Sequence, residues 1–200
     1  MASPAKLAHV VLFTPQVPVM RDWYVTVLDG RVVFENQHAA FITYDEEHHR
    51  IAVADPGGAA RMVEEQVGTA EGMLRASAVA EYDPQTAPKV NESPYGLSHI
   101  AFTYSSLSDL LGTYERLREL SILPGSTVNH GPTSSFYYPD PDGNQVELQI
   151  DNFADVNEAT AFMESPSFAK NPVGVTFDPD VWLRRLRAGE PELSIVAPTW

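Results

Sequence analysis

The stretch "LSHIAFTY", Leu97–Tyr104, is a short apolar run with a histidine in third place, and it repeats the pattern of "LAHVVLF", Leu7–Phe13. Continuous apolar runs of this length are typical of buried strands. Each run is followed by a segment with helical spacing and then by strand-like segments rich in Val, Ile, Phe and Tyr. We therefore predict that one βαβββ module occurs twice in the chain.

In the first copy, the helix is predicted from apolar residues at helical spacing, and Gly30 is expected to be the left-handed residue that ends it. The apolar positions are Val19, Trp23, Val27 and Leu28. Three short strands are predicted next, over 31–37, 39–45 and 49–55. His48 and His49 fall at the entry to the last of them, on opposite sides of the strand by its period of two.

In the second copy, Ser106 is expected to cap a helix with one apolar stripe. The stripe consists of Leu107, Leu110, Leu111, Tyr114, Leu117 and Leu120. The segment "SSFYYPDPDGNQVELQI", residues 134–150, predicts a hairpin. Side-by-side placement of the copies makes Ala52 the counterpart of Glu147.

The predicted organisation is one domain over 1–200, with the first module at about 6–55 and the second at about 95–151. Between them, 56–94 is longer than a plain connector and is expected to contain a helix before a linker. The tail, 152–200, is expected to form two short helices, in "NEATAFMESPSF" and "DPDVWLRRLRAG". The fold class is therefore α+β.

Composition excludes several classes of function. Thirteen basic and 27 acidic residues give a net charge of -14, which disfavours nucleic acid and anionic membranes as partners. Neither a leader peptide nor a membrane-spanning apolar run is recognisable, so a cytoplasmic location is expected. Exposed strand edges favour a homo-oligomer.

Three residues have the chemistry of metal ligands. His9 and His99 occupy equivalent positions in the two copies, and Glu147 lies between apolar neighbours, where an ionised carboxylate is costly unless it is paired or bound to a metal. The chain has no cysteine, so a metal would need His, Asp or Glu ligands. Two histidines and one carboxylate match the ligand set of non-haem Fe(II) enzymes, with Mn(II) as an alternative metal.

These features resemble a known family. The paired modules, the histidines in "LAHVVLF" and "GLSHIAFTY", and the motif "FYYPDPDGNQVEL" are similar to the vicinal oxygen chelate superfamily of glyoxalases, bleomycin-resistance proteins and type I extradiol dioxygenases. The segments "FITYDEEHHRIAV" and "NPVGVTFDPDVWLRRLRAGEPE" resemble single-domain catechol and biphenyl-2,3-diol dioxygenases in particular. The resemblance implies two βαβββ modules that form a half-open barrel around a metal, with a C-terminal helical tail.

The resemblance also implies roles for further residues. His49 matches the acid and base beside the iron, a task suited to histidine because its pKa lies near neutrality. His130 matches a histidine that hydrogen-bonds bound catecholate or dioxygen, although "GPTS" after it departs from the two-domain enzymes. Tyr137 matches a tyrosine that contacts the substrate oxygen, whereas Tyr138 and His48 are expected to face away.

The implied activity is Fe(II)-dependent extradiol cleavage of an aromatic diol with O2, giving a 2-hydroxymuconic semialdehyde-type product. Ala52 favours this reaction over a glyoxalase-type one, because alanine cannot supply the fourth protein ligand that glyoxalases place there. Two alternatives stay open from the sequence. One is a metal-free protein of the bleomycin-resistance type that binds an aromatic compound, and the other is a metal-dependent isomerase or glyoxalase-type enzyme.

Overall fold

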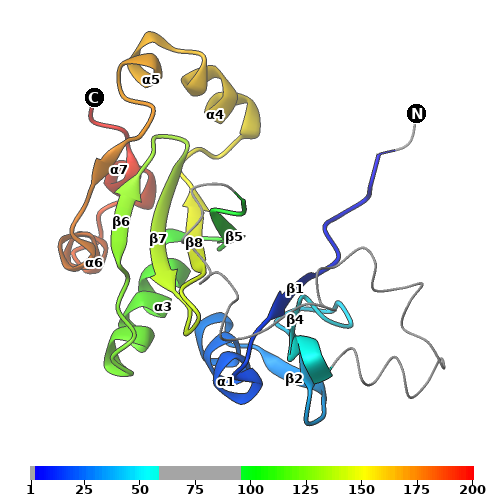
Figure 1. Ribbon diagram of the computed structural model, residues 1–200. Coiled ribbons are helices and arrows are strands. Elements are labelled where there is room, and N and C mark those ends of the chain that lie inside the picture. The colour runs from blue at the N-terminus through cyan, green and yellow to red at the C-terminus, as the bar shows by residue number, and fades with distance from the viewer. Residues whose placement is uncertain (1–2, 59–95) are drawn as a thin grey trace. The chain divides into compact units, whose positions relative to one another are not determined.

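The computed structural model describes residues 3–58 and 96–200 (Figure 1). The helix expected within 56–94 falls almost entirely outside them. The described residues form two compact units, one of 3–58 with the turn Asp140–Gly143 and one of 96–139 with 144–200. Over these residues, no helix has the length and apolar character needed to cross a membrane.

The first unit is a four-stranded mixed sheet with one helix packed on it. Its strands run in the order β1-β4-β3-β2, with β1 parallel to β4. This confirms the predicted βαβββ order. The elements are β1 Val10–Phe13, α1 Val17–Leu28, β2 Arg31–Glu35, β3 Ala39–Thr43 and β4 Ile51–Ala54.

Helix α1 differs from its prediction in two details. Its buried face contains Val17, Met20 and Tyr24 along with the expected Val27 and Leu28, whereas Val19 is 50% exposed. The expected stripe was therefore wrong at its start, where Val17 and Met20 face the sheet in place of Val19.

The left-handed residue that ends α1 is Asp29, with φ 50°, and not Gly30. Aspartate tolerates this conformation better than most residues. Gly30 serves a different purpose, because a Cβ there would lie 2.9 Å from the carbonyl oxygen of Thr43. Glycine lets the start of β2 approach β3 closely.

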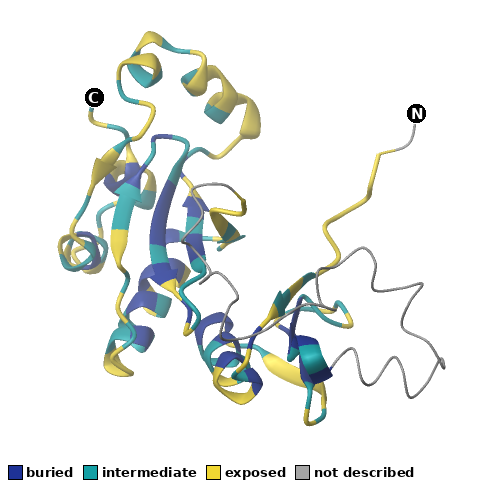
Figure 2. Cartoon of the chain, in the orientation of Figure 1, coloured by how far each residue is buried: buried dark blue, intermediate teal, exposed yellow. Residues whose placement is uncertain are grey.

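The second unit is a five-stranded mixed sheet, in the order β5-β8-β7-β6-β9, with α3 packed against it. Ser106 caps α3 by accepting a hydrogen bond from the Asp109 amide, and the apolar stripe of the helix is buried up to Leu117 (Figure 2). The predicted hairpin is formed by β7 and β8. The elements up to β8 are β5 His99–Thr103, α3 Leu107–Glu119, β6 Ser126–Asn129, β7 Thr133–Pro139 and β8 Gln145–Asp151.

The tail has more structure than the two predicted helices. Its strand β9 pairs with β6 and extends the sheet, and the ring of Phe177 stacks on Trp182 at 3.7 Å between centroids. Sequence reasoning missed β9 because two residues are too short for a period of two to be visible. The tail elements are α4 Val156–Met163, α5 Pro166–Lys170, β9 Val175–Thr176, α6 Pro179–Arg187 and α7 Glu192–Val196.

The first strand of each copy is only half buried. Both β1 and β5 lie at the edge of their sheets and alternate between exposed and partly buried residues. The expectation of a buried strand was wrong. An edge strand packs only one of its faces, whereas an all-apolar sequence is typical of a strand that is buried on both faces. His9 lies just before β1, and His99 is the first residue of β5.

The register of the sheets bears out the duplication. Val11, two residues after His9, pairs with Ala52, and Ala101, two residues after His99, pairs with Glu147. Ala52 is therefore the counterpart of Glu147 in the structure, as the sequence predicted.

Candidate active site

Glu147 is the centre of a hydrogen-bonded group in the second unit. Its side chain extends from the middle of β8 and the residue is only 4% exposed. Oε2 lies 2.9 Å from Nε2 of His99, and Oε1 accepts a hydrogen bond of 3.0 Å from the hydroxyl of Tyr137. The buried carboxylate is thus paired on both oxygens, as burial of a charge requires.

Tyr137 owes its position to the hairpin register, because it pairs directly with Glu147 across β7 and β8. Burial and the neighbouring Glu147 carboxylate raise the pKa of Tyr137 to about 12, so its hydroxyl keeps its proton at neutral pH. Tyr138 points to the opposite face of the sheet and is buried in the core, as predicted.

His130 extends the group beyond Tyr137. Its Nε2 lies 2.9 Å from the Tyr137 hydroxyl oxygen, and its Nδ1 lies 2.6 Å from the backbone carbonyl oxygen of Val173. Four of the predicted site residues therefore form one connected chain: His99, Glu147, Tyr137 and His130.

The His99 and Glu147 pair fits a metal ion. An imidazole nitrogen and a carboxylate oxygen 2.9 Å apart suit neighbouring positions around one first-row metal. Tyr137 binds the carboxylate oxygen that faces away from His99, which fixes the orientation of the carboxylate. Among the described residues, no group of three His, Asp or Glu side chains is gathered as a metal site.

In the first unit, His9 and His49 lie side by side. Their ring centroids are 4.3 Å apart, and the ring of His49 also stacks on Phe41 with an angle of 19° between planes. Phe41 pairs with Ala52 across β3 and β4, which makes it the counterpart of Tyr137. The predicted ligand His9 and the predicted base His49 are therefore neighbours.

His48 and His49 do not lie on a strand, because β4 begins only at Ile51. They belong to the loop after β3, and their Nδ1 atoms are 2.6 Å apart. The expectation that the two side chains point to opposite sides was wrong, since the period of two holds only within a strand. His48 is exposed but in direct contact with His49.

Burial lowers the pKa of His49, and the nearby His9 and His48 lower it further. These three effects disfavour the imidazolium form and outweigh the opposing effect of the nearby Glu47 carboxylate on the pKa. His49 is therefore neutral at neutral pH, with a nitrogen lone pair available to accept a proton.

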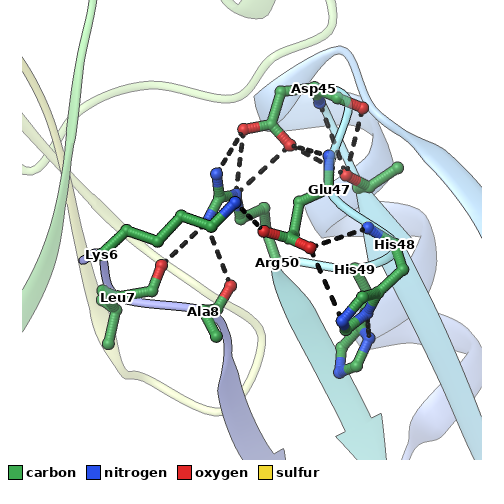
Figure 3. Close-up of polar contacts among 9 residues, drawn as sticks. Lys6, Leu7, Ala8, Asp45, Glu47, His48, His49 and Arg50 are labelled. Atoms are coloured by element: carbon green, nitrogen blue, oxygen red, sulfur yellow. Dashed lines mark hydrogen bonds and ion pairs between the residues drawn. The ribbon is translucent and has the colours of Figure 1, made fainter. Parts of the chain in front are cut away.

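Arg50 links the loop to the segment before His9 (Figure 3). Its guanidinium donates hydrogen bonds to the carbonyl oxygens of Leu7, at 2.7 Å, and Ala8, at 3.1 Å. It also forms a two-point ion pair with the Asp45 carboxylate, at 2.8 and 2.9 Å. Sequence reasoning missed this role, because a single arginine after two histidines has no periodic pattern.

A second ion pair, between Lys6 and Glu47, joins the same two segments (Figure 3). The backbone adds to it, since the Val10 amide donates to the Arg50 carbonyl at 2.9 Å. The segment on either side of His9 is therefore tied to the loop that contains His49.

The comparison with protein families agrees with this architecture. The model of the glyoxalase/bleomycin resistance protein/dioxygenase superfamily matches residues 6–148, so the chain belongs to that superfamily. The lactoylglutathione lyase of Agrobacterium tumefaciens has a similar structure, with a TM-score of 0.51 and 17% identity over 74% of this chain and 96% of that one. This likeness concerns the fold.

Two relatives are similar over nearly the whole chain, and both are dioxygenases of Rhodococcus globerulus. Biphenyl-2,3-diol 1,2-dioxygenase 2 is 43% identical over 200 residues, which are 100% of this chain and 91% of that protein. Biphenyl-2,3-diol 1,2-dioxygenase 3 is 40% identical over 195 residues, 98% of this chain and 89% of that protein. Within the superfamily, the chain is therefore similar to its ring-cleavage dioxygenases.

Proposed function

We propose that the chain is an Fe(II)-dependent extradiol dioxygenase that cleaves a catechol-type diol with O2 and gives a 2-hydroxymuconic semialdehyde-type product. The observation that carries the proposal is the contact of the buried Glu147 with both His99 and Tyr137, in a chain that matches two dioxygenases over its full length. An aromatic diol and O2 are thus the substrates.

His9, His99 and Glu147 are the proposed metal ligands, with Fe(II) preferred and Mn(II) as the alternative. When held by these residues, Fe(II) would bring the diol and O2 together and would supply the redox chemistry between them. Ala52 supports this reaction, because the position equivalent to Glu147 in the first unit has no side chain able to occupy a further position.

His49 is the proposed base. It is neutral, so it can take a proton from a diol hydroxyl and return it later in the reaction. The short contact with His48 holds one proton between the two Nδ1 atoms. When His49 is the donor in this contact, its Nε2 has the free lone pair.

Tyr137 and His130 are the proposed contacts to substrate oxygens. The hydroxyl of Tyr137 stays protonated, and its single hydrogen, which is donated to Glu147 in this structure, can turn to an anionic diol oxygen. His130 is next to Tyr137, and its Nε2 lies 2.9 Å from the hydroxyl oxygen.

The test is oxygen uptake by the protein reconstituted with Fe(II) under anaerobic conditions. Catechol, 3-methylcatechol and 2,3-dihydroxybiphenyl are added in turn, and the names of the two relatives make 2,3-dihydroxybiphenyl the preferred substrate. We expect one O2 consumed per diol and a yellow product. Iron-loaded protein that consumes no O2 with any of the three would contradict the proposal and favour a binding protein.

A homo-oligomer is part of the proposal. Strand β2 is an edge strand, and in the described part of the chain Val32, Val33 and Phe34 are all exposed on it. Exposed apolar edges pair readily with other chains. Sedimentation velocity is expected to give a species larger than one chain, and a monomer at micromolar concentration would contradict this.

A further inference from the structure

We propose that residues 171–177 of the tail, here called the strap, are a positioning element of the active site that holds His130 in one tautomer and one orientation. The inference rests on the proposed function, in which His130 acts beside Tyr137. It gives a role to a segment outside the duplicated modules.

The first step is the hydrogen bond between His130 and the strap. A carbonyl oxygen can only accept, so the 2.6 Å contact between Val173 O and His130 Nδ1 requires the hydrogen to be on Nδ1. In the neutral ring, Nε2 then has the lone pair, 2.9 Å from the Tyr137 hydroxyl oxygen, and competes with Oε1 of Glu147 for the single hydroxyl hydrogen. The strap thus selects which ring nitrogen faces the site.

The second step is the attachment of the strap to the strand before His130. Strand β9 pairs with β6 at Asn129↔Val175 and Val128↔Thr176. The hydroxyl of Thr127 also donates to the Phe177 carbonyl at 2.5 Å. These contacts fix the C-terminal end of the strap against β6.

The third step is the turn that presents the Val173 carbonyl. The side chain of Asn171 closes it, donating to the Gly174 carbonyl at 2.9 Å and accepting from the Gly174 amide at 3.1 Å. Asn171 therefore holds the two peptide units on either side of Gly174, and the first of these contains the Val173 carbonyl.

The fourth step is the close approach of the two backbones. Gly174 has φ +93°, and a Cβ at this position would lie 2.1 Å from the Asn129 carbonyl oxygen and 2.7 Å from Cα of His130. Any side chain at 174 must push the strap away from His130. The glycine is thus required by contact as well as by backbone conformation.

The chain offers a matched control for this contact. Gly189, also in the tail, has φ +84°, and a Cβ there would meet no atom of the described residues within 4 Å. Alanine at either position suffers a similar backbone strain, but only Gly174→Ala displaces the strap. The difference between the two variants isolates the effect of the contact with His130.

The tautomer is measured first, by 15N-detected histidine spectra of the full-length protein loaded with diamagnetic Zn(II). His130→Gln identifies the His130 signals by their loss. We expect the Nδ1–H tautomer in the unaltered protein and in Gly189→Ala, and a mixture of tautomers in Gly174→Ala. Asn171→Ala loosens the turn without adding a clash and is expected to give the same mixture, which keeps the test valid if Gly174→Ala fails to fold.

Turnover of the Fe(II)-loaded protein is measured next. Displacement of a positioned group by about 1 Å can reduce a rate by a factor of ~100, so we expect Gly174→Ala and Asn171→Ala to lower kcat by about 10-fold to 100-fold. In a His130→Ala background, the same changes should have no further effect, because the strap acts through His130.

Two results would overturn the inference. One is an unaltered protein whose His130 is the Nε2–H tautomer, and the other is a Gly174→Ala loss of kcat that persists in full in the His130→Ala background. Failure of the proposed function is distinguishable from both. It would show as no O2 uptake by the unaltered protein, while the tautomer measurement would still decide the role of the strap.

Discussion

Nε2 of His99 lies 2.9 Å from Oε2 of Glu147, although the two residues are two register positions apart on neighbouring parallel strands. The carboxylate leans along β8 toward the start of β5, and its other oxygen is held by Tyr137. A buried acid with this pair of contacts is oriented for a ligand that both His99 and Glu147 can share.

Removal of the carboxylate tests this arrangement. We expect Glu147→Gln to abolish stoichiometric iron binding and O2 uptake, because a neutral amide is a much poorer ligand than a carboxylate. Metal content is measured after anaerobic loading. Asp151→Asn, which removes an exposed carboxylate from the end of the same strand, is the control and should keep both iron and activity. Full iron content in Glu147→Gln would exclude Glu147 as a ligand.

The base is tested by variants of the two adjacent histidines. His49→Ala should retain iron and lower kcat by about 100-fold to 10,000-fold, the range for loss of a general base. His48→Ala removes the contact between the Nδ1 atoms and the contact of His48 with Glu47, but leaves His49 in place, and should have a smaller effect. Steady-state kinetics on protein of measured iron content separate the two. Normal turnover by His49→Ala would show that another group takes the proton.

Tyr137 and Tyr138 form a natural pair for comparison. Tyr137→Phe removes a hydroxyl in contact with both Glu147 and His130, and we expect kcat/KM to fall about 10-fold or more with iron retained. The hydroxyl of Tyr138 has no hydrogen-bond partner among the described residues, so Tyr138→Phe should leave kcat/KM within about twofold. Equal effects of the two changes would argue against a role for Tyr137 at the substrate.

Arg50 should act on the metal site through His9. Arg50→Gln removes the donors to the Leu7 and Ala8 carbonyls, so the segment around His9 is left with the ion pair of Lys6 and Glu47 and the backbone bond of Val10 as attachments to the loop. We expect the dissociation constant for Fe(II) to rise about 10-fold, the lower end of the range for residues that orient ligands. Arg31→Gln is the control, because Arg31 donates to the Asp45 carbonyl and leaves Leu7 and Ala8 untouched. An unchanged dissociation constant in Arg50→Gln would show that Arg50 does not influence the binding of Fe(II).

The ion pair between Asp45 and Arg50 predicts a pH dependence of stability. The hydrogen bond from Arg50 is the largest influence on Asp45 and holds the pKa of that carboxyl below its ordinary value. A lowered pKa in the folded state contributes stability above the ordinary pKa of aspartate, about 4, and loses it as the pH falls further. The melting temperatures of the unaltered protein and Asp45→Asn should therefore differ most at pH 7 and converge toward pH 3. A difference of constant size across this range would contradict the prediction.

The sequence by itself determined the duplicated βαβββ module, because period-two strands, an apolar helical stripe and the Ser106 cap are local patterns. It also determined the equivalence of Ala52 and Glu147 and placed His9 and His99 at matching points. These features follow from residue order and need no knowledge of which surfaces meet.

Only the tertiary structure decided how the candidate site is supported. The Nδ1 contact of His48 and His49 depends on a loop conformation, and the attachment of Leu7 and Ala8 to Arg50 joins residues more than 40 positions apart. The contact between Val173 and His130 likewise needs the tail to return to β6 as a strand. The contacts of Arg50 and His130 connect distant segments through single carbonyl groups, which every residue carries, so no pattern in the sequence marks the ones that are used.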